Sequence, residues 1–264
     1  MELRLGDDGP PEPLLGAASL LETERDLDLP VHVRVSDDPD ERTWAGHYED
    51  RHVLNISRKA ATSAMARELA LHEFAHMARY EEGHPSHVQP TEEALFLALA
   101  GRSVERHRLA HCYQIANHMK DVYADDITLS VGPGGKLVTF FESQLAAAVA
   151  DRPREHHHPD SRLLTGSADP DITAVNAAFA LAMCERHDLV DRGHRLYDLA
   201  HAAADDAPGV DVAAFTRLFR SLAEDPSASE YRRTLVDAAR RYAVDASGSG
   251  GSGDGPGDGT AAAD

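Results

Sequence analysis

Three residues in this 264-residue chain have the types and spacing of a zinc-dependent hydrolase. His72, Glu73 and His76 form an H-E-x-x-H pattern. Residues four apart on a helix lie on one face, so both imidazoles can reach one Zn²⁺ ion. Glu73 lies beside them, where a carboxylate can act as the general base toward a water molecule. The pattern predicts a zinc hydrolase, most simply a soluble peptidase, with Zn²⁺ as its cofactor and a peptide or protein as its substrate.

The segment around this pattern predicts the helix that the chemistry needs. Residues 62–82 are rich in strong helix formers, and Thr62 is a plausible N-cap. Gly83 stands where a C′ glycine belongs, and Pro85 follows it. Apolar residues on more than one face indicate that the helix is buried. A buried helix whose two histidines are satisfied by hydrogen bonds, without metal, is the alternative.

A catalytic zinc usually has three protein ligands and one water, so a third ligand must lie elsewhere. The best segment is 106–125, where polar side chains recur at helical spacing and share one face. Such a stripe faces either solvent or a metal site, and spacing alone leaves both open. The residues of the stripe are His111, Gln114, His118, Asp121 and Asp125.

The sequence D-V-Y-A-D at residues 121–125 resembles a motif of gluzincin-type zincin metallopeptidases. In several of these families, including CaaX-processing and heat-shock proteases, a later helix carries E-x-x-A-D, and its Glu is the third zinc ligand. The resemblance covers roughly residues 30–126, without the membrane segments. It implies that Asp121 is the third ligand, with Asp in place of Glu, and that Asp125 orients a ligand histidine. The whole chain also resembles a haloarchaeal family of conserved proteins without assigned function.

Other roles at the expected site are less narrowly assigned. The donor that stabilises the oxyanion is one of Tyr113, His118 and Tyr123. A strand at residues 52–56 is expected at the sheet edge, where an extended peptide could pair with it. Weaker rival ligands are Glu92, Glu93, His84, His87 and the run His156, His157 and His158. Glu142, on the next helix, is a candidate to contact a ligand without binding the metal itself.

A non-catalytic protein is the competing class. In that case the zincin-like helices hold a structural metal, or bind a peptide or partner without cleaving it. The fourth coordination position discriminates between the two classes, because a structural zinc is closed by a fourth protein ligand, such as His118.

The composition of the chain disfavours some classes of binding partner and indicates where the protein is located. The formal net charge is −19, from 45 acidic and 26 basic residues, and only Lys59, Lys120 and Lys136 are lysine. A surface so acidic and poor in lysine is typical of a halophile, so a high-salt cytosol is expected. It disfavours nucleic acid, whose phosphates require clustered Lys and Arg. No apolar run is long enough to span a bilayer and no signal peptide is visible, which predicts a soluble cytoplasmic protein. Cys112 and Cys184 are expected to be buried thiols.

The periodicity of apolar residues predicts an α+β fold, with a small N-terminal β-sheet, zincin-like active-site helices and a helical C-terminal part. Three regions are expected, at 1–150 (zincin-like domain), 151–245 (helices packed on it) and 246–264 (a disordered acidic Gly/Ser tail). Strands are expected at 31–35, 43–48 and 52–56. Helices are expected at 14–27, 62–82, 91–124 with a break near Gly101, 136–150, 170–187, 191–205, 211–223 and from Ser227 onward. Asp169 is expected to cap the helix that begins with Pro170, and Ser227 and Glu230 to form a capping box. Residues 1–13 are expected to be irregular.

Overall fold

The protein combines a small sheet near its N-terminus with helices that make up most of the remaining chain. The computed structural model describes residues 1–6, 9–151 and 169–245. The expected mixed fold, sheet first and helices after, is confirmed at this coarse level. The predictions for His156 to His158 and for the tail at 246–264 fall outside the described residues.

The sheet has four strands in the order β1-β2-β4-β3. They are β1 (Leu3–Arg4), β2 (Val31–Ser36), β3 (Trp44–His47) and β4 (His52–Ser57). β1 and β4 both pair in parallel with β2, and β3 pairs antiparallel with β4. Hydrophobic alternation predicts β2, β3 and β4 closely. It misses β1, because two residues are too few for a pattern to emerge in a segment expected to be irregular.

The expectation that residues 52–56 form the sheet edge is wrong. β4 pairs with β2 on one side and with β3 on the other, and all six of its residues are buried. The apolar residues of this segment indicate burial but do not show which strands pair with it. Both neighbours, β2 and β3, come earlier in the chain and lie on opposite sides of β4. The edge next to β4 is β3.

Eleven helices are described, several with the predicted caps. The side chain of Asp169 accepts a hydrogen bond from the Ile172 N–H, ahead of Pro170 in the first turn. Ser227 and Glu230 form the expected reciprocal capping box. The helices are α1 (Pro11–Leu21), α2 (Arg58–Ala61), α3 (Ala66–Glu81), α4 (Pro85–Val88), α5 (Thr91–Leu99), α6 (Arg106–Val131), α7 (Gly135–Ala150), α8 (Pro170–Arg186), α9 (Arg195–Asp206), α10 (Val212–Arg220) and α11 (Ala228–Asp245).

The helix that carries the H-E-x-x-H pattern is α3, which starts later than predicted and ends as predicted. Thr62 does not cap it. Thr62 directly follows the one-turn helix α2, and its hydroxyl donates to the carbonyl of Arg58 in that helix. At the other end Gly83 has a φ of 66°, where glycine is favoured. The Gly83 N–H donates to the Tyr80 carbonyl and the His84 N–H to the Arg79 carbonyl, which together form a Schellman motif.

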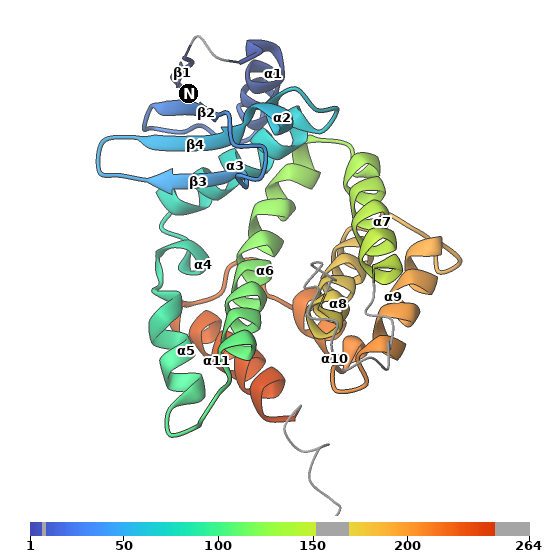
Figure 1. Ribbon diagram of the computed structural model, residues 1–264. Coiled ribbons are helices and arrows are strands. Elements are labelled where there is room, and N and C mark those ends of the chain that lie inside the picture. Colours follow the sequence, from blue (N-terminus) through green and yellow to red (C-terminus); the bar gives the residue numbers. More distant parts are fainter. Residues whose placement is uncertain (7–8, 152–168, 246–264) are drawn as a thin grey trace, which may run out of the picture.

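Helix α6 joins the two halves of the hydrophobic core. One cluster packs α1, β2, β4 and α3 against the last third of α6, through Ala124 and Ile127. The other packs the remainder of α6 against α5 and the helices from α7 to α11, and includes the free thiols of Cys112 and Cys184. Figure 1 shows α6 running away from the sheet, with α4 and α5 on one side and α7 to α10 on the other. Helix α3, which carries the H-E-x-x-H pattern, is thereby packed against helix α6, which carries Asp121.

Candidate metal centre

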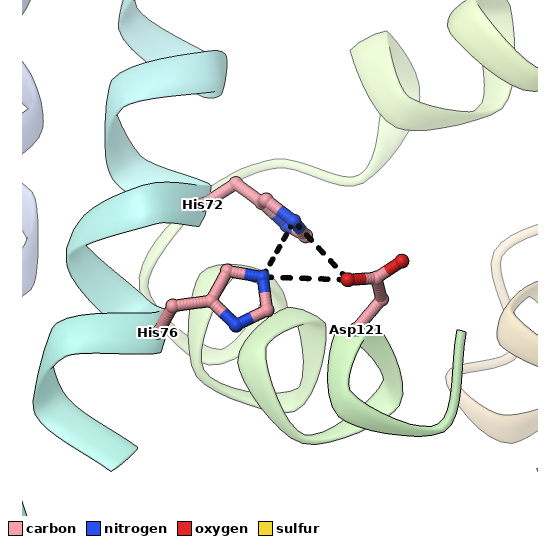
Figure 2. A group of neighbouring side chains, drawn as sticks. All are labelled: His72, His76 and Asp121. Carbon is pink, nitrogen blue, oxygen red and sulfur yellow. Dashed lines mark hydrogen bonds and ion pairs between the residues drawn. The ribbon is translucent and has the colours of Figure 1, made fainter. Parts of the chain in front are cut away.

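His72, His76 and Asp121 converge on one point between α3 and α6 (Figure 2). The Nε2 atoms of the two histidines are 3.0 Å apart. Asp121 Oδ1 lies 3.3 Å from His76 Nε2 and 3.7 Å from His72 Nε2. The two histidines share a face because they are about one helical turn apart on α3. Asp121 projects toward them from α6.

These three atoms fit the donor set and the size of a zinc site. Two imidazole nitrogens and one carboxylate oxygen form a typical catalytic set. Bonds of about 2.1 Å in a tetrahedron place ligand atoms roughly 3.4 Å apart, close to the three separations above. Within the part of the chain that the structure describes, this group has three members, so the set leaves one tetrahedral position for another ligand.

Asp125 supports His72 from behind. Its Oδ1 lies 2.7 Å from His72 Nδ1, on the ring edge opposite Asp121. A carboxylate has no proton to give at neutral pH, so His72 Nδ1–H donates and the Nε2 lone pair faces the centre. Burial opposes a charge on His72, but the carboxylates of Asp125 and Asp121 outweigh it and raise the pKa of His72 well above its usual value. A cation, whether proton or metal, is thus favoured between these groups.

Asp121 is the negative charge of the centre. Burial would raise the pKa of its carboxyl group, but contacts with His118, His72 and His76 hold that pKa well below its usual range. His118 Nδ1 lies 3.5 Å from Asp121 Oδ2, the oxygen that faces away from His72 and His76. His118 is fixed by Asn176 Oδ1, 2.8 Å from its Nε2, and by stacking on Phe179. His118 therefore contacts the third-ligand candidate and is not a fourth member of the group.

Glu73 is buried beside the two histidines, with 8% of its surface exposed. Burial raises the pKa of its carboxyl group above the usual value, although His72 and His76 act in the opposite direction. The N–H of Ala45, in strand β3, also favours the charged form. A carboxylate with a raised pKa is better suited to accept and release a proton near neutral pH.

A cavity of about 770 Å³ opens beside the centre. His72, Glu73 and Asp121 line it together with Gln114 and His118, and its other walls are mainly apolar. Helices α7 and α8 supply much of that apolar wall. The apolar side chains include Leu69, Leu71, Leu129, Leu137, Phe140, Phe141, Leu145, Ile172 and Phe179.

The remaining candidates from the sequence lie elsewhere. Tyr113 is partly exposed and Tyr123 is buried against His84, and neither is among the residues that line the cavity. Glu142 lies on α7, where its carboxylate is 3.9 Å from the His194 ring. Glu92 and Glu93 occupy the first turn of α5, as a helix-start role predicts.

His87 contacts the centre in a way that the sequence does not predict, since the sequence suggests it only as a weaker rival ligand. Its Nε2 lies 2.7 Å from His76 Nδ1, so it contacts a ligand candidate from behind. Burial lowers the pKa of His87 to about 2. The signal was the run H-P-S-H directly after Gly83, which resembles a solvent-exposed loop in sequence but forms the one-turn helix α4 against α3.

The chain belongs to a family described as "Family of unknown function (DUF5781)", which it matches over residues 1–244. The match includes every residue of the centre described above. Neither the curated proteins nor the solved structures contain a match to this sequence. None of the helices described in the structure has the length and apolar character that a bilayer crossing requires.

Proposed function

We propose that this protein is a zinc-dependent hydrolase, and specifically a peptidase, with His72, His76 and Asp121 as the zinc ligands and Glu73 as the general base. The observation that carries the proposal is the convergence of three lone-pair donors at tetrahedral spacing on the wall of a cavity. When bound, zinc would act as a Lewis acid that lowers the pKa of water and polarises a carbonyl group.

The protein's own groups then have separate tasks. Glu73 would take a proton from the attacking water and return it to the leaving amine, for which its raised pKa is suitable. Asp125 would hold the His72 ring with its Nε2 lone pair toward the metal. His118 would hold Asp121 through Nδ1, and of the three oxyanion-donor candidates from the sequence it alone lines the cavity.

The apolar cavity and the sheet edge favour an extended substrate with a large apolar side chain. Helices α7 and α8 supply a wall of leucine and phenylalanine side chains, which would bury such a group. Strand β3, at the sheet edge, carries the Ala45 N–H next to Glu73, and Thr43 just before it lines the cavity. A peptide would therefore pair with β3, in place of the interior strand β4.

Metal analysis of the full chain purified in high salt tests the proposal. We expect one zinc per chain in the wild type and in Glu73→Gln, and loss of zinc in His76→Ala. Glu73→Gln should lose roughly 10²–10⁴-fold of the hydrolysis of an unstructured protein substrate. A wild type that stays zinc-free after remetallation ends the proposal. Stoichiometric zinc without hydrolysis would favour the non-catalytic class instead.

A further inference from the structure

An unbroken series of hydrogen-bonding groups runs from His76 to the loop between α10 and α11. His76 Nδ1 lies 2.7 Å from His87 Nε2, and His87 Nδ1 lies 2.7 Å from Ser86 Oγ. Ser86 Oγ lies 2.7 Å from His84 Nδ1, and His84 Nε2 lies 3.4 Å from the Glu224 carbonyl oxygen. Ser86 is fully buried and His84 is 6% exposed, so water does not compete for these bonds.

Two backbone groups fix the protons at the far end of this series. A peptide N–H can only donate and a carbonyl can only accept. His84 Nδ1 accepts from the backbone N–H of Ser86 at 3.3 Å, and His84 Nε2 faces the Glu224 carbonyl. His84 is therefore neutral and carries its proton on Nε2.

The remaining protons follow from that one. Because His84 Nδ1 has no proton, the Ser86 hydroxyl donates to it and accepts in turn from His87 Nδ1–H. With its single proton on Nδ1, the neutral His87 ring has a lone pair on Nε2, and this atom lies 2.7 Å from His76 Nδ1. His76 Nδ1–H then donates to His87, and the His76 Nε2 lone pair faces His72 and Asp121.

Local structure explains how these residues come together. The Schellman motif at Gly83 turns the chain sharply, so that His84 becomes the N-cap of α4 and the turn folds back against α3. Helix α11 holds this turn from the other side. Gln89 Nε2 donates to the Ala228 carbonyl, and Arg232 Nε donates to Gln89 Oε1.

We propose that His84, Ser86 and His87 are positioning residues that hold His76 in the Nδ1–H tautomer, so that it can bind zinc through Nε2. The series ends at the Glu224 carbonyl. The loop between α10 and α11 therefore helps to orient a residue of the proposed metal site. This inference rests on the proposed function, because it assigns the orientation of one of the proposed ligands.

Zinc titration of the full-length protein tests the inference. We expect His87→Ala to weaken zinc binding by roughly 10–100-fold, as outer-shell changes at zinc sites do. Ser86→Ala, which removes one hydroxyl group, should weaken it less. His87→Gln should restore part of the affinity, because its amide oxygen can accept from His76 and its N–H can donate to Ser86. His111→Gln is the matched control, since His111 is a buried histidine of α6 that bonds to Tyr242, and it should leave zinc affinity unchanged.

Nitrogen-15 NMR of the imidazole rings tests the tautomer directly in the zinc-free wild type, without any variant. Protonated His76 Nδ1 is the expected result, with the other tautomer gaining population in Ser86→Ala. His76 found with its proton on Nε2 alone would overturn the inference. So would wild-type affinity for zinc in both His87→Ala and Ser86→Ala. If the wild type binds no zinc, the proposed function is wrong. The NMR measurement in the zinc-free protein then still shows whether His76 has the inferred tautomer.

Discussion

The two proposed histidine ligands form hydrogen bonds to different kinds of acceptor through the ring nitrogen that does not face the centre. This difference should affect how strongly each one binds zinc. His72 donates to a carboxylate, Asp125, whereas His76 donates to a neutral imidazole, His87. A charged acceptor raises the basicity of a ligand histidine more than a neutral one does. We therefore expect His72 to be the stronger zinc donor of the pair.

Asp125→Asn tests this at the residue scale. The amide oxygen can still accept from His72 Nδ1–H, so the ring stays oriented, but the negative charge is lost. Zinc affinity should fall by roughly 10-fold or more, while Asp125→Ala should reduce it further. Isothermal titration in high salt measures both. Equal affinities for wild type and Asp125→Asn would show that orientation alone matters at His72.

Residue types and spacing, together with the family resemblance, predict the group of His72, His76 and Asp121. They do not predict the residues that contact this group. Helical periodicity predicts that His72 and His76 share a face, and the resemblance selects Asp121 from the polar stripe on α6. The roles of His84, Ser86 and His87 could not be predicted in the same way. Polar residues after a glycine are typical of a solvated loop, and their burial here depends on α11, whose sequence lies about 140 residues further along.

At the scale of the elements, Asp126 and Arg186 join α6 to α8 through two hydrogen bonds of 2.7 and 2.8 Å. Arg186 also donates to the carbonyls of Arg220 and Leu222 at the end of α10. Burial would raise the pKa of Asp126, but His187 and Arg186 outweigh it and hold that pKa below its usual value. This pair therefore supports the helices that wall the cavity.

Arg186→Met should destabilise the protein by about 3 kcal/mol near neutral pH, because it leaves Asp126 buried without its main partner. A carboxyl group with a lowered folded-state pKa contributes stability above its unfolded pKa of about 3.9, and this contribution is lost as pH falls through the folded pKa. The gap between wild type and variant in urea unfolding should thus narrow below about pH 4. Arg220→Met removes the more exposed pair with Glu185 and should cost less than about 1 kcal/mol. Equal losses of stability in Arg186→Met and Arg220→Met would contradict the role given to the buried pair of Asp126 and Arg186.

Local signals predict most elements, and non-local pairing accounts for the errors. The C′ glycine at Gly83, the cap at Asp169 and the capping box at Ser227 depend on neighbours within a few residues, and all three are present. Strand β1 and the interior position of β4 depend on pairing across intervening segments, which periodicity does not report.

At the scale of the whole molecule, the net charge of −19 predicts a strong dependence on salt. Raising KCl from about 0.1 M to about 1 M shortens the Debye length from about 10 Å to about 3 Å and screens the repulsion among surface carboxylates. The Tm should rise over this range. Sucrose, which stabilises without screening charge, is the control for general exclusion effects. A Tm that is flat or falls with KCl would contradict the prediction.

Two hydrophobic clusters make up the core of the described residues, and neither of them ends at residue 150. Helix α7, expected in the first domain, packs with α8 and α9 in the second cluster, and α6 contributes to both. Composition and loop signals mark a long polar segment after Ala150, but they do not show which helices pack together across it.

The residues around the centre come from distant parts of the chain, so they are synthesised at different times. A nascent chain exposes the H-E-x-x-H helix early, yet Asp121, the α8 side chains and the Glu224 carbonyl leave the ribosome only later. The centre cannot be complete until nearly the whole folded part has been synthesised. Under the proposed function, the cell would be protected from an active protease fragment during translation.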